Sequence, residues 1–375
     1  MLQNQTIQDK NTQSEQNTYG MSECEIKNLP ETIEKTADIT KEQLAFLLAT
    51  EDDAMIQDLK QRARNTGDRI YGKNVYIRGL IEFTNYCKND CLYCGIRRSN
   101  CHADRYRLTE EEILSCCKIG YELGFRTFVL QGGEDPALTN DQIEMTVARI
   151  RQEYPDCAIT LSLGEKSREA YERFFRAGAN RYLLRHETYN ELHYRQLHPA
   201  EMSGKRRLQC LADLKEIGYQ TGTGIMVGSP GQTVEHIIED LLFIEKLRPE
   251  MIGIGPFLPH HDTPFAEYPS GTAEQTILLL SIFRLMHPSA LIPATTALAT
   301  LASDGRERGI LAGANVVMPN LSPREERKKY ELYNDKASLG AESAEGLAAL
   351  QKQLKTIGYE ISTERGDFKY TTENI

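Results

Sequence analysis

Residues 82–95 read EFTNYCKNDCLYCG, and they follow an apolar run typical of a β-strand. Cys87, Cys91 and Cys94 stand at C-x3-C-x2-C spacing, which brings three thiols into one short loop. A cubane iron–sulfur cluster normally takes four cysteine thiolates, so a loop with three would leave one iron open to an exchangeable ligand. The loop therefore predicts a cluster at which chemistry can begin.

A structural zinc site is the competing interpretation of these cysteines, with Cys101 or His102 as the fourth ligand. Structural zinc sites more often use two separated pairs of ligands, and this difference favours the cluster. Tyr93, directly before the third cysteine, has two interpretations. It packs beneath the loop, or it covers a nucleoside held beside the cluster.

The composition of the whole chain limits the class of protein. Its 375 residues are enough for a core that needs no disulfide bonds, and its nine cysteines form no regular disulfide framework. We therefore expect a reducing, cytoplasmic location. No apolar run is long enough to span a bilayer, so no membrane association is expected. The net charge of -10 argues against broad binding to nucleic acids.

Four regions follow one another along the chain. Residues 1–38 are polar and poor in large apolar side chains, which predicts a flexible tail. Residues 39–72 show the spacing of N-terminal helices. We expect the main domain over residues 73–323. Residues 324–375 are strongly charged at first and predict a C-terminal appendage with a terminal helix.

Strand-like and helix-like runs alternate through the main domain. Alternation of this kind implies parallel strands with crossover helices, which places the chain in the α/β class. Eight units favour a closed (β/α)8 TIM barrel over an open sheet. The expected strands are Val75 to Phe83, Thr127 to Gln131, Ala158 to Leu163, Arg181 to Arg185, Gly222 to Val227, Met251 to Pro256, Leu291 to Thr295 and Asn315 to Met318.

Polar, glycine and proline residues gather directly after these strands, for example in Gly132-Gly133-Glu134-Asp135-Pro136 and Pro259-His260-His261-Asp262. In a closed barrel, the loops that follow the strands all meet at one mouth. The cysteine loop can therefore share a site with carboxylates, histidines and arginines drawn from several strands.

The cysteine spacing, the aromatic residue before the third cysteine and the barrel context resemble the radical S-adenosylmethionine superfamily. This resemblance implies that Cys87, Cys91 and Cys94 hold a 4Fe-4S cluster. It also implies that S-adenosylmethionine chelates the open iron through its amino and carboxylate groups. One-electron reduction then cleaves the sulfonium to a 5'-deoxyadenosyl radical, and a closed barrel keeps water away from that radical.

Gln131 and the turn Gly132-Gly133-Glu134 resemble the segment of this superfamily that binds the methionine amino group. The turn follows the second expected strand, which is the place that the resemblance requires. Taken alone, the same residues equally fit a tight turn between a strand and a helix. Their role as cosubstrate ligands is therefore implied by the resemblance only.

Three other strands supply residues that resemble further cosubstrate contacts. Glu165 resembles the residue that holds the ribose or the amino end, and Arg185 resembles the residue that binds the methionine carboxylate. Ile225 and Met226 resemble the fifth-strand contact to adenine, which Tyr93 would also cover. Without the resemblance, these residues fit a barrel-lining ion pair and a core strand equally well.

Within the superfamily, the chain most resembles the HydE family of FeFe-hydrogenase maturases, which belongs with biotin synthase and methylornithine synthase. The resemblance covers nearly everything from about Thr40 to Tyr333, and the ATTA and HHDTP segments favour HydE over its relatives. It implies that the substrate is an iron–cysteine carbonyl-cyanide intermediate. This intermediate lies on the way to the two-iron subcluster of the hydrogenase H-cluster.

A deep polar cavity for an anionic iron complex is implied by this resemblance. A buried Arg or Thr usually only satisfies hydrogen bonds, so each individual residue has a structural explanation as well. Met226 would help to shape the cavity. The candidate substrate contacts are Arg78, Arg168, His186, Thr295, Thr296 and Tyr333.

The resemblance also implies a low-potential electron donor such as ferredoxin or flavodoxin, and the maturases HydG and HydF as partners.

Some HydE proteins carry a second cluster on C-terminal cysteines, but residues 334–350 contain none, so we expect one cluster. Two alternatives stay open. One is a methylornithine synthase-like radical mutase with an amino-acid-derived substrate, and the other is a zinc- or cluster-stabilised binding protein without enzymatic activity.

Overall fold

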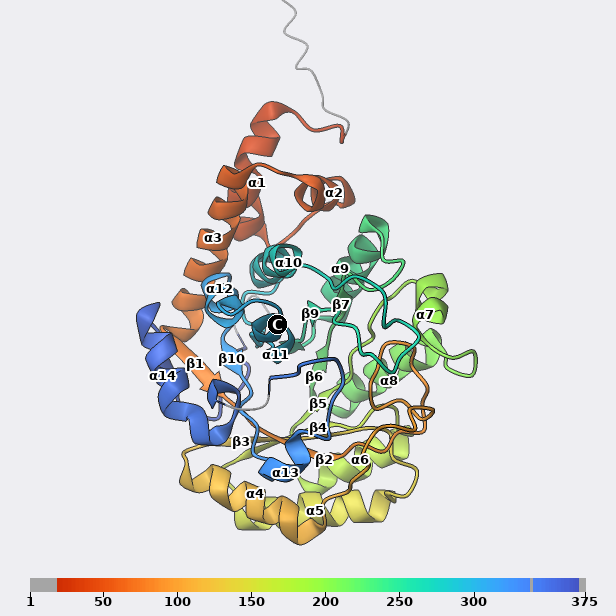
Figure 1. The fold of residues 1–375 in the computed structure, drawn as a ribbon. Coiled ribbons are helices and arrows are strands. Elements are labelled where there is room, and N and C mark those ends of the chain that lie inside the picture. Colours follow the sequence, from red (N-terminus) through yellow and green to blue (C-terminus); the bar gives the residue numbers. More distant parts are fainter. Residues whose placement is uncertain (1–18, 338–339, 371–375) are drawn as a thin grey trace, which may run out of the picture.

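The computed structural model describes residues 19–337 and 340–370. Short parallel strands surround a central axis, and helices cover their outer side (Figure 1). The strands are β1 (Asn74–Ile77), β2 (Gly79–Thr84), β3 (Thr127–Gly132), β4 (Ala158–Ser162), β5 (Arg181–Leu183), β6 (Gln220–Thr223), β7 (Met226–Val227), β8 (Met251–Ile252), β9 (Gly255–Pro256), β10 (Val316–Val317) and β11 (Glu360–Ser362).

Parallel pairing runs around the whole ring of strands. β2, β3, β4, β5, β6 and β8 form one six-stranded sheet, and β10 pairs with β1. Between β8 and β10, residues 291–293 make the connection, because Leu291 pairs with Met251 and Pro293 pairs with Val316. Since β1 and β2 are consecutive parts of one expected strand, these pairings close the ring. The predicted barrel is confirmed.

Four of the expected strands are broken or irregular. The first is interrupted at Arg78, and the fifth and sixth are interrupted at Gly224 and Gly253. A Cβ atom on Gly224 would lie 1.8 Å from the carbonyl oxygen of Gly253, so only glycine allows the two backbones to approach this closely. The seventh expected strand forms only isolated bridges, and Pro293 within it has no N–H to donate.

The outer helices begin at polar caps and bury their apolar sides against the strands. Thr109 and Thr139 start two of them with capping boxes, in which side chains satisfy the first free backbone N–H groups. None of the helices in residues 19–337 and 340–370 is long and apolar enough to cross a membrane. The helices are α4 (Glu110–Glu122), α5 (Asn140–Glu153), α6 (Arg168–Ala177), α7 (Glu191–Leu197), α8 (Gly204–Ile217), α9 (Val234–Leu247), α10 (Ala273–Met286), α11 (Thr296–Leu301), α12 (Gly305–Leu311), α13 (Arg324–Arg327) and α14 (Leu347–Thr356), with 3-10 turns η1 (Gly340–Glu342) and η2 (Ala344–Gly346).

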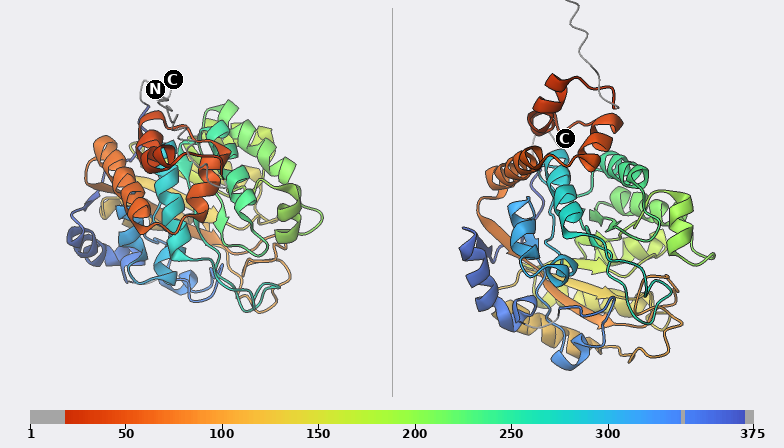
Figure 2. Two further views of the ribbon diagram at one scale, coloured as in Figure 1. Left: turned by 90° about the horizontal axis from the view of Figure 1, so that it is seen from above. Right: turned by 45° about the horizontal axis from the view of Figure 1, so that its top comes forward.

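Helices α1 (Glu23–Thr36), α2 (Lys41–Ala49) and α3 (Asp53–Tyr71) precede the barrel, and α3 packs along α10 (Figure 2). Helix α1 lies in the stretch 1–38 that we expected to be a flexible tail, of which residues 1–18 are outside the described part of the chain. Ser22 starts α1 with a capping box, and Leu29 and Ile33 are fully buried. These apolar contacts stabilise a helix whose overall composition is polar.

The C-terminal region takes part in the barrel. β11 pairs in parallel with β1, on the side opposite β10. Further along, Asp367 forms an ion pair with Arg181, whose guanidinium is fully buried and also donates to the carbonyl oxygens of Arg365 and Gly366. Because Arg181 is the first residue of β5, residues 360–367 close the end of the barrel that lies opposite the cysteine loop.

Candidate active site

The three cysteines lie in the loop that follows β2, at the carboxyl end of the barrel. Hydrogen bonds connect their loop to several other segments, and these bonds fix the conformation of the loop. Asn85 accepts a bond from Tyr106 N–H, and its amide group donates to two carbonyl oxygens. Backbone bonds also run from Lys88 to Glu134, from Leu92 to Leu197 and from Gly95 to Leu332.

Arg105 is a structural residue of this loop that the sequence analysis missed. Its guanidinium donates to the carbonyl oxygens of Asn85, Ile96, Arg97 and Asn100 at distances between 2.5 and 3.1 Å. One cation therefore satisfies four acceptors on both sides of the cysteines. An Arg in a polar loop carries no periodic signal, so the sequence did not distinguish it from a solvated residue.

The thiols of the loop fit the chemistry of an iron–sulfur cluster. Burial raises the pKa of Cys94 to about 12, and burial also raises the pKa values of Cys87 and Cys91. Ionised thiolates here need nearby cations, which iron ions provide. His102, considered as a fourth zinc ligand, has its Nδ1 atom 2.8 Å from Asp262 Oδ1, and Cys101 is exposed. The geometry therefore suits a cluster held by three cysteines.

Tyr93 lies on an apolar wall beside the cysteines. Its ring packs against a small cluster that contains Met226, Phe257 and Phe265. Its hydroxyl lies 3.2 Å from His198 Nε2, and the two rings meet edge to face. The ring is thus fixed at both its apolar body and its polar tip, which makes it a preformed surface for a flat apolar group. Met226, the expected adenine contact, shares this wall.

The turn Gly132-Gly133-Glu134 packs directly against the cysteine loop. A Cβ atom on Gly133 would lie 2.2 Å from the carbonyl oxygen of Tyr86 and 2.8 Å from Cys87 Cβ, so the close approach requires glycine. The Glu134 carboxylate is buried and forms an ion pair with Lys88 at 3.2 Å. Gln131 lies one residue earlier on β3. The expected segment and the cysteines are therefore brought together.

Arg207 is the most important residue that the sequence analysis missed. It reaches in from α8, and its Nε atom donates to Glu165 Oε1 at 2.7 Å. A second carboxylate, that of Glu134, lies 3.9 Å from its Nη2 atom. Burial lowers the pKa of Arg207, but the electrostatic effects of Tyr194, Glu165 and Glu134 outweigh it, and the pKa is raised. A permanent cation thus lies among the residues expected to bind the cosubstrate.

Arg185 and Glu187 form a second charged pair at the end of β5, at 2.9 Å. Arg185 Nη2 also donates to the carbonyl oxygen of Ile225, while its buried Nε has no hydrogen-bond partner among the described residues. Glu187 has a backbone φ of 65°, which is unusual for a residue other than glycine. Ile225 pairs with Glu187 through an isolated bridge. The expected residues Arg185 and Ile225 thus meet at one point.

Several of the expected substrate residues face the inside of the barrel. Arg78 reaches across to Met251, with its Nη1 atom 3.1 Å from the sulfur. Thr295 lies opposite Gly255, where an added Cβ would be 2.8 Å from the Thr295 hydroxyl. Burial raises the pKa of the Tyr333 phenol, which interacts with the side chains of Glu82 and Thr300. These residues come from different strands and loops. Arg78 lies near Arg181 and Asp367, toward the end of the barrel that residues 360–367 close, whereas Tyr333 lies near Glu82 and Arg185.

Three other expected substrate residues lie elsewhere. Arg168 is the first residue of α6, where it pairs with Glu216 of α8 on the outside of the barrel. His186 points outward between β5 and α9, because side chains alternate along a strand and Arg185 already faces inward. Thr296 donates to Glu342. The prediction that these three line the substrate cavity is therefore wrong for Arg168 and His186, and Thr296 is already paired with a carboxylate.

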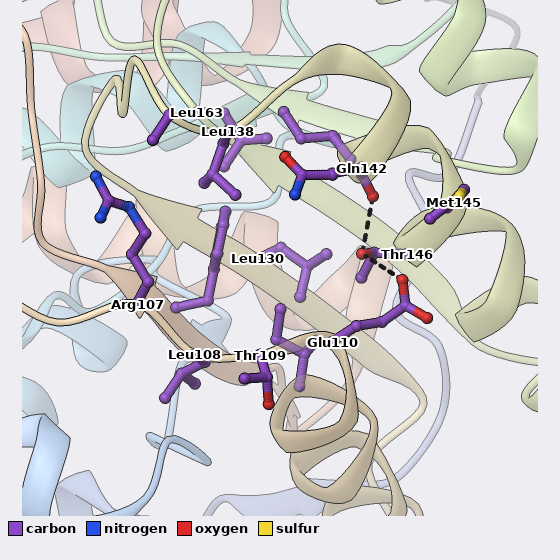
Figure 3. A pocket seen from close by; sticks show the side chains of 14 residues that line it. Arg107, Leu108, Thr109, Glu110, Leu130, Leu138, Gln142, Met145, Thr146 and Leu163 are labelled. Carbon is purple, nitrogen blue, oxygen red and sulfur yellow. Dashed lines mark hydrogen bonds between the residues drawn. The ribbon is translucent and has the colours of Figure 1, made fainter.

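A separate cavity of about 290 Å³ lies outside the barrel, between β3, α4 and α5. Leu130, Leu138 and Leu163 line it, and Arg107 lies at its edge (Figure 3). Arg107 forms an ion pair with Asp135, which follows the glycine turn. The cavity contains none of the residues expected to bind the cluster or the cosubstrate, so we do not assign the active site to it.

The comparisons with known proteins agree with this arrangement. Residues 81–244 match the Radical SAM superfamily. The [FeFe] hydrogenase maturase subunit HydE of Thermotoga maritima is 41% identical, and the match covers 90% of this chain and 96% of that protein. 3-Methylornithine synthase of Methanosarcina barkeri is 31% identical, with 80% and 84% covered. The crystal structure of methylornithine synthase (PylB) has a TM-score of 0.76 at 27% identity and covers 89% of this chain and 97% of its own.

Enzymes of this superfamily use an iron–sulfur cluster together with S-adenosylmethionine, and the cysteine loop fits such a cluster. The identity with HydE extends over nearly the whole chain and exceeds that with 3-methylornithine synthase. The chain is therefore a radical S-adenosylmethionine enzyme, and it belongs to the family of the FeFe-hydrogenase maturase HydE.

Proposed function

We propose that this chain is a HydE-type maturase that processes an iron–cysteine carbonyl-cyanide precursor during assembly of the FeFe-hydrogenase H-cluster. Cys87, Cys91 and Cys94 hold one 4Fe-4S cluster. When bound, this cluster supplies the electron that cleaves S-adenosylmethionine. Family membership supports the reaction type, and the charges inside the barrel support the class of substrate.

The guanidinium of Arg78 is the observation that carries the substrate class, because among the described residues it bonds only to the Met251 sulfur, a weak acceptor. Its Nε and Nη2 atoms and the Thr160 hydroxyl are buried without hydrogen-bond partners among the described residues. Thr160 faces the interior, because Ile159 and Leu161 on either side of it pack outward into the main core. A buried cation without acceptors is costly, and an anionic ligand supplies the acceptors that are missing. These donors therefore favour an anionic iron complex.

For S-adenosylmethionine we propose the residues around the cysteine loop. Arg185 and Arg207 are cations suited to bind its carboxylate. Tyr93 and Met226 offer an apolar surface for adenine. The turn around Gly133 approaches the cysteines closely enough to bind the amino group through its backbone. Further contacts are proposed for Gln131, Gly132, Glu134, Glu165 and Ile225.

The direct test uses purified protein, loaded with its cluster under anaerobic conditions and reduced with dithionite. We expect release of 5'-deoxyadenosine and support of hydrogenase maturation in an extract that lacks HydE. The methylornithine synthase alternative predicts that lysine is converted to methylornithine, without any effect on maturation. A stable cluster with no cleavage of S-adenosylmethionine would instead favour a binding protein.

Partners follow from the same proposal. We propose ferredoxin or flavodoxin as the low-potential electron donor, and HydG and HydF as the maturases before and after this enzyme. Support for these partners comes from family membership only. Pull-down of each purified partner with the cluster-loaded chain would test them.

Replacing Arg78 with methionine is expected to separate stability from function. Burial lowers the pKa of Arg78, which reflects the cost of its charge inside the barrel. Removing this charge should stabilise the fold by about 1–3 kcal/mol, because the hydrogen bond that is lost goes only to the Met251 sulfur, a weak acceptor. Urea unfolding would measure the gain. Maturation activity should fall at least tenfold, while cleavage of S-adenosylmethionine without substrate should persist.

Thr66→Val is a suitable control, because it also removes a buried polar group without a partner among the described residues. Thr66 lies on α3, away from the barrel interior. It should leave maturation activity unchanged. If Arg78→Met matured hydrogenase as well as the unmodified protein, the assignment of Arg78 to an anionic substrate would be wrong.

A further inference from the structure

A buried imidazole–carboxylate pair lies on the outer side of β5, away from the interior of the barrel. His186 Nε2 is 3.3 Å from Asp240 Oδ1, and both side chains are fully buried. This approach is an electrostatic contact, because Nε2 forms no hydrogen bond among the described residues. The other ring nitrogen of His186 lies 2.8 Å from the Thr223 hydroxyl of the neighbouring strand β6. The His186 ring also packs edge to face against Phe243 of α9. Helix α9 is thus joined to the ends of two strands.

Asp240 holds the chain after β5 at a second point. The backbone N–H of Tyr189 donates to Asp240 Oδ1 at 2.5 Å, and the Tyr189 ring stacks on Phe243. One carboxylate of α9 therefore fixes the residues on both sides of Glu187. Burial raises the pKa of Asp240, so its environment is costly for the charged form.

The segment that is held in this way is strained. Glu187 has a φ of 65°, in the left-handed region that disfavours side chains other than glycine. Such a conformation costs on the order of 1–3 kcal/mol and persists only when the surroundings determine it. Here the surroundings are the two contacts to Asp240 and the bond from Glu187 N–H to the carbonyl oxygen of Gly224. The strained conformation turns Glu187 back toward Arg185, while His186 faces outward.

An apolar pair would fill the space between β5 and α9 at lower cost, because removing buried charges from a protein is often neutral or stabilising. The polar pair therefore needs another explanation. Asp240 contacts both His186 and the backbone N–H of Tyr189, the residues on either side of Glu187 in the Arg185–Glu187 ion pair. The pair thus acts on the geometry of these two side chains at the mouth of the barrel.

We propose that Asp240, acting through His186 and Tyr189, is a positioning residue for the Arg185–Glu187 pair and thereby for binding of S-adenosylmethionine. This inference rests on the proposed function, because it takes the mouth of the barrel as the cosubstrate site. Asp240 itself lies on the outer helix layer and touches no reacting group. Its role is to keep the strained turn in the one conformation that directs Arg185 and Glu187 together.

The test compares Asp240→Ala with Asp240→Asn in cluster-loaded protein. Alanine removes both contacts, so the Michaelis constant for S-adenosylmethionine in 5'-deoxyadenosine formation should rise at least tenfold, while the turnover number changes less than threefold. Asparagine keeps the oxygen acceptor for the Tyr189 N–H and a polar oxygen beside His186, so it should restore the constant to within threefold of the unmodified protein. Loss of stability alone would not produce this split between the two kinetic constants.

Asp213→Asn is the matched control, because Asp213 is another buried carboxylate on an outer helix, and among the described residues it bonds to Arg168 and Gln209. It should leave both constants unchanged. If Asp240→Ala does not load its cluster, His186→Leu provides the same comparison, since it removes the imidazole but leaves the bond between Asp240 and Tyr189.

The outcomes separate the two proposals. If Asp240→Ala and His186→Leu both keep their clusters and bind S-adenosylmethionine within twofold of the unmodified protein, the positioning role is wrong. If the unmodified, cluster-loaded protein does not bind S-adenosylmethionine in equilibrium dialysis, the proposed function itself fails. If the Michaelis constant of Asp240→Asn rose as much as that of Asp240→Ala, the geometric argument would be contradicted, because asparagine preserves the acceptor for Tyr189.

Discussion

Cys91→Ala is expected to abolish both the cluster and the cleavage of S-adenosylmethionine. The unmodified protein should bind about four irons per chain after anaerobic reconstitution, which is the content of one cubane. Removing one of three thiolates leaves the cluster with two protein ligands, and the loop offers no replacement among the described residues close to it. Cys87→Ala and Cys94→Ala should behave in the same way. Iron and sulfide analysis together with 5'-deoxyadenosine release would measure these effects.

Cys101→Ser is the matched control for this experiment. Cys101 is exposed in the same loop region, and the neighbouring His102 is directed to Asp262. The variant should keep about four irons and full cleavage activity. Loss of the cluster in Cys101→Ser would contradict the three-ligand assignment and favour a site with a fourth protein ligand.

Arg181→Ala is expected to produce the largest loss of stability. Its side chain is fully buried and binds Thr127, Gln220 and Asp367 at distances between 2.7 and 3.2 Å, in addition to two carbonyl oxygens. Removing Arg181 leaves the buried Thr127 hydroxyl and the Gly366 carbonyl oxygen without their donor, and each such buried group typically costs about 1–3 kcal/mol, whereas Asp367 is partly exposed and regains water. Urea unfolding of the cluster-free protein would measure the change.

Arg365→Ala provides the comparison, since Arg365 is partly exposed and also contacts Asp367, at 2.9 Å. It should cost less than about 1 kcal/mol, as surface pairs do. Equal stability of Arg181→Ala and Arg365→Ala would show that the C-terminal segment does not depend on the buried cation. In that case the pairing of β11 with β1 alone would close the end of the barrel opposite the cysteine loop.

The sequence predicted those features of the fold and the site whose residues lie close together along the chain. The cysteine spacing, the glycine turn and the alternation of strands and helices each lie within a few residues, and they predicted the barrel and the loop correctly. His186 was misplaced because its neighbour Arg185 was also assigned to the interior, although consecutive strand residues face opposite sides. Strict attention to this alternation would have placed His186 against α9.

Arg207 had a signal that was overlooked. It precedes Cys210, Leu211 and Leu214 by three, four and seven positions, which puts it on the buried side of α8. A cation on the apolar side of a helix indicates a buried partner. Its actual partner, Glu165, follows a different strand, and no local pattern connects the two positions.

Two elements that the sequence did not predict, helix α1 and strand β11, have different explanations. The capping box at Ser22 and the spacing of Leu29 and Ile33 indicate α1, but the polar composition of residues 1–38 concealed them. Strand β11 is short, and its pairing with β1 joins residues that are far apart in sequence. Such a contact depends on the completed barrel, so the isolated stretch around Glu360–Ser362 shows no decisive strand pattern.

The pairing of β11 with β1 also has a consequence for the order of events during synthesis. Residues 74–77 leave the ribosome early, but their partner residues 360–362 follow only after all the other barrel strands have been translated. Until then, one edge of β1 exposes unpaired backbone groups, and such edges promote misassociation of nascent chains. The cysteine loop, in contrast, is complete soon after β2 has emerged. The cysteine loop is therefore synthesised long before the opposite end of the barrel can close.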